Sequence, residues 1–175
     1  MAALLPLALG GVGCEEASSV RDLDSGADSE PPGLLSDLPA SSLDPAAAVR
    51  GQTLYVPSYS QVLVEAERRL GVTVTLSIHN VDFEHPITLT SVRYYRSEGT
   101  LIEEFLKDGP VELKPMQTAM KAVARSDVRG GEGANFVVEW ISDQEVNPPL
   151  TEAVMVFARG QGFSFTSRGV VIDER

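Results

Sequence analysis

Residues 72–80 read VTVTLSIHN, and this stretch decides the fold class of the chain. Apolar and polar residues alternate along it without a break. A period of two places all the apolar side chains on one face of a β-strand and the polar ones on the other. The face predicted to be buried consists of Val72, Val74, Leu76 and Ile78. The stretch therefore predicts a strand that is half buried and half solvated.

Residues 86–96, PITLTSVRYYR, show the same alternation with one change of phase. Ile87 and Leu89 share the predicted inner face, and Val92 and Tyr94 continue it after one extra residue near Ser91. An extra residue of this kind is the sequence signature of a β-bulge. Further short runs of strand formers cover residues 52–60, 100–106, 116–125, 134–141, 153–158 and 163–166.

These runs predict the fold class. They give eight or nine short strands separated by turn residues, and the closest approach to an amphipathic helix, Val64–Leu70, is too short to be stable alone. Short strands at regular spacing favour an all-β fold, and we predict an immunoglobulin-like antiparallel sandwich over residues 51–175. A small β-barrel is the alternative.

The charge of the chain limits its partners. Its net charge is −11, of which residues 1–50 contribute −6 and the remaining residues −5. Nucleic-acid binding depends on Lys and Arg contacts with phosphates, so we predict no nucleic-acid partner. A single cysteine forms no internal disulfide, so stability must come from burial of a core.

The amino terminus has the composition of an export signal. The apolar run Ala2–Leu9 is too short to span a bilayer but fits the apolar region of a secretory signal. The small residues that end at Cys14 resemble the lipobox of bacterial lipoproteins, although Gly11 stands where that family prefers Leu. The resemblance implies a signal peptide over residues 1–14 and a lipid on Cys14. An ordinary secretory signal is the alternative.

The segment after Cys14 differs from the rest of the chain. Residues 15–50 are acidic, rich in Ser, Ala and Pro, and lack aromatic residues, which predicts a disordered tether. Leu34, Leu35 and Leu38 could instead dock on the folded domain. By resemblance to lipoproteins, Glu15 after the cysteine favours the outer membrane, so we expect a periplasm-facing outer-membrane lipoprotein.

Several blocks of residues 51–172 resemble a family of small bacterial lipoproteins that is defined only as a domain of unknown function. The blocks keep the order of the family, and the resemblance implies an exported, lipid-anchored, β-rich domain without assigned catalytic residues or cofactor. They are GQTLYVPSYS from Gly51, VTLSIHNVD from Val74, ITLTSVRYY from Ile87, GGEGANFVVEW from Gly130 and NPPLTEAVM from Asn147.

The strongest chemical cluster is HNVDFEH, residues 79–85. His79, Asp82 and His85 are of the types that bind Zn²⁺ or Cu²⁺, so they are candidate metal ligands. Their spacing matches no established metal motif, and a solvated hairpin loop is the simpler interpretation.

Catalytic motifs are missing from the sequence. The Gly-rich run 130–135 lacks the Gly-Lys-Ser/Thr ending of a phosphate loop, and there is no Gly-x-Ser-x-Gly elbow. We therefore expect no cofactor and a non-catalytic envelope module that binds another envelope protein or a small ligand. A periplasmic metal carrier and a hydrolase of envelope polymers are the alternatives.

Overall fold

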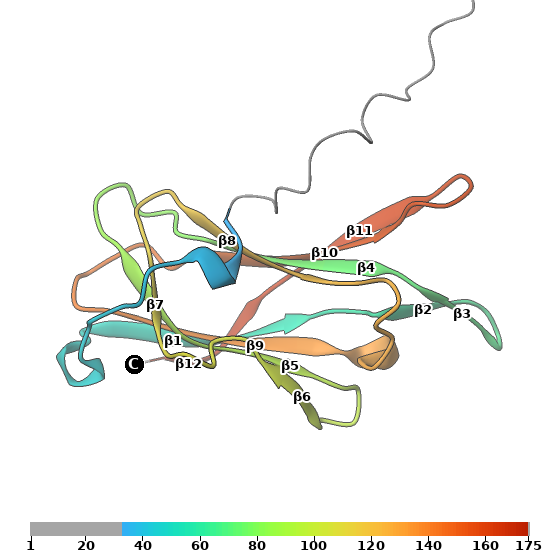
Figure 1. The fold of residues 1–175 in the computed structure, drawn as a ribbon, viewed down its shortest axis with the longest axis horizontal. Helices are drawn as coiled ribbons and strands as arrows, with labels where there is room; N and C mark the ends of the chain where they lie inside the picture. The colour runs from blue at the N-terminus through green and yellow to red at the C-terminus, as the bar shows by residue number, and fades with distance from the viewer. Residues whose placement is uncertain (1–32, 175) are drawn as a thin grey trace, which may run out of the picture. The chain divides into compact units, whose positions relative to one another are not determined.

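The computed structural model describes residues 33–174, which form 12 strands and three short 3-10 helices. Two antiparallel sheets pack face to face and neither closes on itself, so the predicted sandwich is confirmed over the described residues and the alternative barrel is wrong (Figure 1). Within these residues no helix has the length and apolar character needed to cross a bilayer.

The larger sheet has the order β12–β1–β9–β5–β6, with β7 also paired to β5. Its strands are β1 (Arg50–Pro57), β5 (Ile87–Tyr95), β6 (Leu101–Glu104), β7 (Val111–Leu113), β9 (Asn135–Ser142) and β12 (Val170–Glu174). The smaller sheet has the order β11–β10–β4–β8. Its strands are β4 (Thr73–His79), β8 (Thr118–Val123), β10 (Leu150–Phe157) and β11 (Phe163–Arg168).

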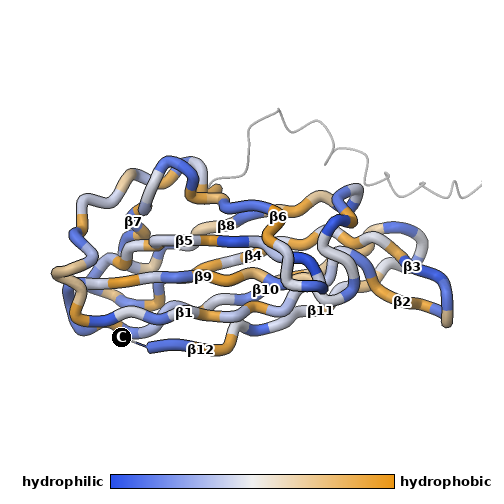
Figure 2. Tube along the Cα trace, turned by 90° about the horizontal axis from the view of Figure 1, so that it is seen from below, coloured by the Kyte–Doolittle hydropathy of each residue, from blue (hydrophilic) through white to orange (hydrophobic). Residues whose placement is uncertain are grey.

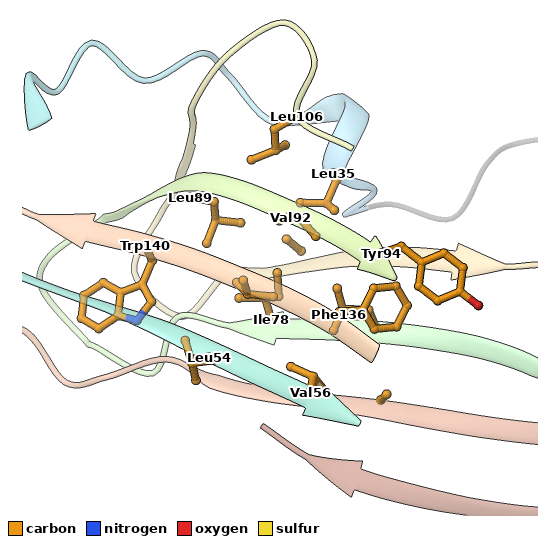
Figure 3. Close-up of a cluster of buried hydrophobic side chains, with 14 of the residues drawn as sticks. Leu35, Leu54, Val56, Ile78, Leu89, Val92, Tyr94, Leu106, Phe136 and Trp140 are labelled. Atoms are coloured by element: carbon orange, nitrogen blue, oxygen red, sulfur yellow. The ribbon is translucent and has the colours of Figure 1, made fainter. Parts of the chain in front are cut away.

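The alternation that decides the fold is present in β4. Val74, Leu76 and Ile78 of β4 and Val72, which directly precedes it, are all fully buried in the core between the two sheets. The bulge predicted near Ser91 is confirmed, because the pairing of β5 with β9 shifts by one residue between Leu89 and Ser91. This shift lets Leu89 and Val92 both reach the core (Figure 3).

Two elements differ from the sequence-based prediction. Residues 61–71, which include the segment closest to a helix pattern, form a hairpin of β2 (Gln61–Glu65) and β3 (Arg68–Gly71). Val62 is partly buried and packs against the core, and it pairs with Leu70 across the hairpin. Strand pairing and this contact outweigh the weak helical pattern of a segment that is too short to be a helix. Strands β3, β7 and β12 are also additional to the eight or nine predicted.

The end of the predicted tether is ordered. Residues 33–49 include η1 (Leu35–Asp37) and η2 (Pro45–Ala47), and Leu35 and Leu38 belong to the buried core. The segment 33–41, here called the strap, joins both sheets: Met120 of β8 donates its N–H to Gly33 O at 2.7 Å, and Glu112 of β7 donates to Pro39 O at 2.9 Å. Disorder over residues 33–49 was therefore the wrong prediction, since two leucines docking on the core offset the cost of ordering the strap.

Candidate functional site

The β4–β5 loop, residues 80–86, contains most of the cluster that the sequence singles out. Asn80 is buried, and its side chain fixes the conformation of this loop by hydrogen bonds. Its side-chain amide donates to the carbonyl oxygens of His85, Leu113 and Lys114 at 3.0, 3.1 and 3.1 Å. Its Oδ1 accepts the N–H of Asp82 at 3.0 Å. The start of the loop is thereby fixed to the turn that precedes β8.

Asp82 fixes the rest of the loop. Its Oδ1 accepts the N–H groups of Glu84 and His85, both at 2.9 Å, and its Oδ2 accepts the N–H of Asn147 at 3.0 Å. These donors hold the pKa of the Asp82 carboxyl well below its usual range, Asn147 having the largest effect. The ionised carboxylate therefore ties the β4–β5 loop to the β9–β10 loop, residues 143–149.

The lowered pKa of Asp82 predicts a loss of stability in acid. Its carboxylate stabilises the folded protein fully above the pKa of an unfolded aspartate, about 3.9, and this contribution is lost as the pH falls toward the lower pKa of the folded state. Asp82→Asn should lower the thermal unfolding midpoint by several degrees at about pH 7. On acidification, the midpoint of the variant should fall less than the midpoint of the wild-type protein, because the variant has no carboxylate to lose at position 82. The exposed Asp143, changed to Asn, is the control and should behave as wild type. Parallel pH curves for Asp82→Asn and wild type would contradict this role.

The structure brings Asp82 and His85 together but places His79 in a different group. His85 Nδ1 lies 3.4 Å from Asp82 Oδ1. His79 is the last residue of β4, with Nδ1 at 2.9 Å from Thr118 Oγ1 and Nε2 at 4.0 Å from Glu152 Oε1. Between residues 33 and 174, no three His, Cys, Asp or Glu side chains are grouped so that they could hold a metal ion.

Thr118 of β8, His79 of β4 and Glu152 of β10, here called the row, lie on neighbouring strands. Thr118 is directly opposite His79, and Glu152 is diagonal to it. A hydroxyl beside an imidazole is one requirement of acyl transfer, which bears on the hydrolase alternative. The row lies on the outer face of the smaller sheet, where ladder hydrogen bonds engage the backbone N–H groups of these strands. Donors of this kind would be needed to stabilise an oxyanion, so the geometry favours a structural role for the row.

Phe83 is the feature that the sequence analysis did not identify. It lies at the tip of the β4–β5 loop and is 78% exposed. A shallow groove beside it runs between residues 82–85 and residues 145–147. Arg50 also lines this groove, and its Nη1 donates a hydrogen bond to Val146 O at 2.7 Å. The signal in the sequence is an aromatic residue placed between two acids, Asp82 and Glu84.

The Gly-rich run 130–135 serves packing. Ser97 Oγ donates to Gly130 O at 3.0 Å and accepts the N–H of Gly133 at 2.8 Å. A Cβ on Gly130 would lie 2.1 Å from the buried Tyr94 hydroxyl, so only glycine fits there. Cys14, the predicted lipid attachment site, lies outside the described residues.

The fold and the loop define a β-sandwich domain with a rigid, aromatic-tipped loop at one end. Residues 51–172 match the family described as "Protein of unknown function (DUF3124)", and the chain belongs to this family. No curated protein matches the chain. The crystal structure of Thermotoga maritima 1070, from Thermotoga maritima, is similar at 11% identity with a TM-score of 0.39, over 68% of this chain and 92% of that one.

Proposed function

We propose that this protein is a lipid-anchored, non-catalytic binding module of the bacterial envelope, whose partner contacts the β4–β5 loop. The small residues ending at Cys14 support the anchor, which by resemblance would be in the outer membrane, facing the periplasm. The exposure of Phe83 on a loop fixed by Asn80 and Asp82 is the observation that carries the binding role.

A fixed, exposed aromatic residue favours binding for two physical reasons. A phenylalanine side chain buries a large apolar area when it enters a pocket on a partner, and aromatic residues often dominate binding energy. The loop is already held in one conformation by hydrogen bonds from Asn80 and to Asp82, so little ordering cost remains to be met on binding.

The charge around Phe83 indicates the chemistry of the partner. The exposed acids Glu84 and Glu145 flank the groove, and Arg50, which lies within it, is 3.6 Å from Glu145 Oε2. An acidic border favours a partner with Lys or Arg around an apolar pocket. We therefore favour another envelope protein as the partner over a small apolar ligand.

The proposal predicts the behaviour of two variants in living bacterial cells. The wild-type chain should sediment with membranes, whereas Cys14→Ser should appear in the soluble periplasmic fraction. A photo-crosslinking amino acid in place of Phe83 should give one discrete crosslinked product in the membrane-anchored protein. Mass spectrometry of the amino-terminal peptide and of the product measures both results.

The crosslink needs a matched control. Leu63 of β2 is also exposed, and the β2–β3 hairpin lies at the opposite end of the sandwich from the β4–β5 loop (Figure 1). The same photo-crosslinker at position 63 should therefore not give this product. Lys in place of both Glu84 and Glu145 should weaken the crosslink at position 83. An unacylated wild-type Cys14 would contradict the anchor. Equal products from positions 63 and 83 would contradict the binding loop.

A further inference from the structure

Met116 is the one residue other than glycine with a positive φ between residues 33 and 174, and its φ is 58°. This left-handed conformation brings Cβ close to the backbone, so it is disfavoured for residues with a side chain. Met116 is also 58% exposed, so packing in the core does not explain a large apolar side chain at this position. Backbone strain of this kind clusters at functional sites in proteins.

The turn between β7 and β8, residues 114–117, imposes this conformation. The N–H of Gln117 donates to Lys114 O at 3.1 Å, and Gln117 Oε1 accepts the N–H of Lys114 at 2.9 Å. Pro115 at the second position and a positive φ at the third are typical of a type II turn, in which the third residue is usually glycine or asparagine. Either residue would form this turn with less strain, so the fold alone does not account for a methionine there.

The turn is fixed directly to the candidate binding loop. Met116 donates its N–H to Asp82 O at 3.1 Å, and this oxygen belongs to the peptide bond that joins Asp82 to Phe83. The Asn80 side chain adds two hydrogen bonds, to the carbonyl oxygens of residues 113 and 114. One backbone hydrogen bond therefore connects the positions of two exposed apolar side chains, Phe83 at 78% and Met116 at 58% exposure.

We propose that Met116 contacts the same partner as Phe83, so that the two side chains form one apolar contact. This inference rests on the proposed binding role of the β4–β5 loop. Met116 is not among the residues that line the groove beside Phe83, so the contact extends beyond that groove. Phenylalanine is a rigid anchor, whereas the flexible, polarisable thioether adapts to an irregular pocket. The partner should therefore present an apolar pocket with room for both side chains, next to the basic residues expected opposite Glu84 and Glu145.

Stability and binding should respond in opposite directions when Met116 is changed to Asn. Asparagine tolerates the left-handed conformation, so the thermal unfolding midpoint of the full chain carrying Cys14→Ser should rise by about 2 °C. In the membrane-anchored chain, Met116→Asn should lower the yield of the crosslinked product from position 83 severalfold. Met116→Leu keeps both the strain and an apolar side chain, so it should leave both measurements close to those of the parent chain.

Leu63 provides the matched control, because it is 56% exposed and lies in the regular strand β2. Figure 2 shows β2, with its hydrophobic segment, at the opposite end of the sandwich from β7, after which the turn of Met116 begins. Leu63→Asn should therefore neither raise the midpoint nor change the product from position 83. If Met116→Asn lowers the midpoint and the product together, or leaves the product unchanged, the proposal is overturned.

A photo-crosslinking amino acid at position 116 tests the contact directly. In the membrane-anchored chain it should give the product found from position 83, with the same partner peptides in mass spectrometry. A product from position 83 and none from position 116 would overturn this inference and leave the binding role of Phe83 intact. Different partner peptides from the two positions would also overturn the shared contact, and no product from either position would contradict both proposals.

Discussion

Trp140→Ala is expected to lower the free energy of unfolding by about 3–5 kcal/mol. Trp140 is 1% exposed in β9, which lies between β1 and β5 in the larger sheet. Its ring packs in the core near Leu54 (Figure 3). Truncation removes the largest buried side chain and leaves a cavity that paired strands on both sides prevent from collapsing. Urea unfolding followed by circular dichroism measures the loss.

Two control variants separate volume from other effects. Trp140→Phe should cost less than Trp140→Ala, because the indole N–H has no hydrogen-bond partner and only part of the volume is lost. Leu101→Ala on β6 should have little effect, since Leu101 is about half exposed. A loss below about 1 kcal/mol for Trp140→Ala would contradict its place in the core.

Features with a short sequence period could be predicted without the structure. The inner face of β4, the bulge near Ser91 and the burial of Trp140 on the same face of β9 as Phe136 all follow from alternation, because a strand between two neighbours has one face against the core. The β2–β3 hairpin was not predicted, since its pairing depends on contacts that a single segment does not reveal.

The candidate site was predicted only in part. The loop was located from the concentration of His, Asn and Asp, and a solvated turn was the simpler interpretation of it. The sequence could not show that Asp82 accepts the N–H of Asn147, because 65 residues separate them along the chain. The exposure of Phe83 follows from that long-range contact, as the turn is held in a conformation that points its tip away from the core. The structure separates His79 from His85 because β4 ends between them.

The strap gives the second large expected effect. Leu35→Ala and Leu38→Ala should each lower the free energy of unfolding by about 2 kcal/mol, the lower end of the range for buried leucines. Both side chains are at least nine-tenths buried, but they lie on a segment at the edge of the sandwich that can adjust more than β9. The double variant should be destabilised nearly as much as Trp140→Ala, and thermal or urea unfolding of the full chain measures it.

The position of the strap explains why two alanines should matter so much. The strap bridges β8 of the smaller sheet and β7 of the larger one, so losing its leucines removes core contacts and weakens the connection between the sheets. Ser36→Ala is the control, because Ser36 is exposed and its hydroxyl donates only to the neighbouring Asp37 at 3.1 Å. Amide exchange of Met120 and Glu112, which donate to the strap, should accelerate in the double variant and not in Ser36→Ala. Unchanged exchange at both amides together with wild-type stability would show that residues 33–41 act as a tether, as their composition alone suggested.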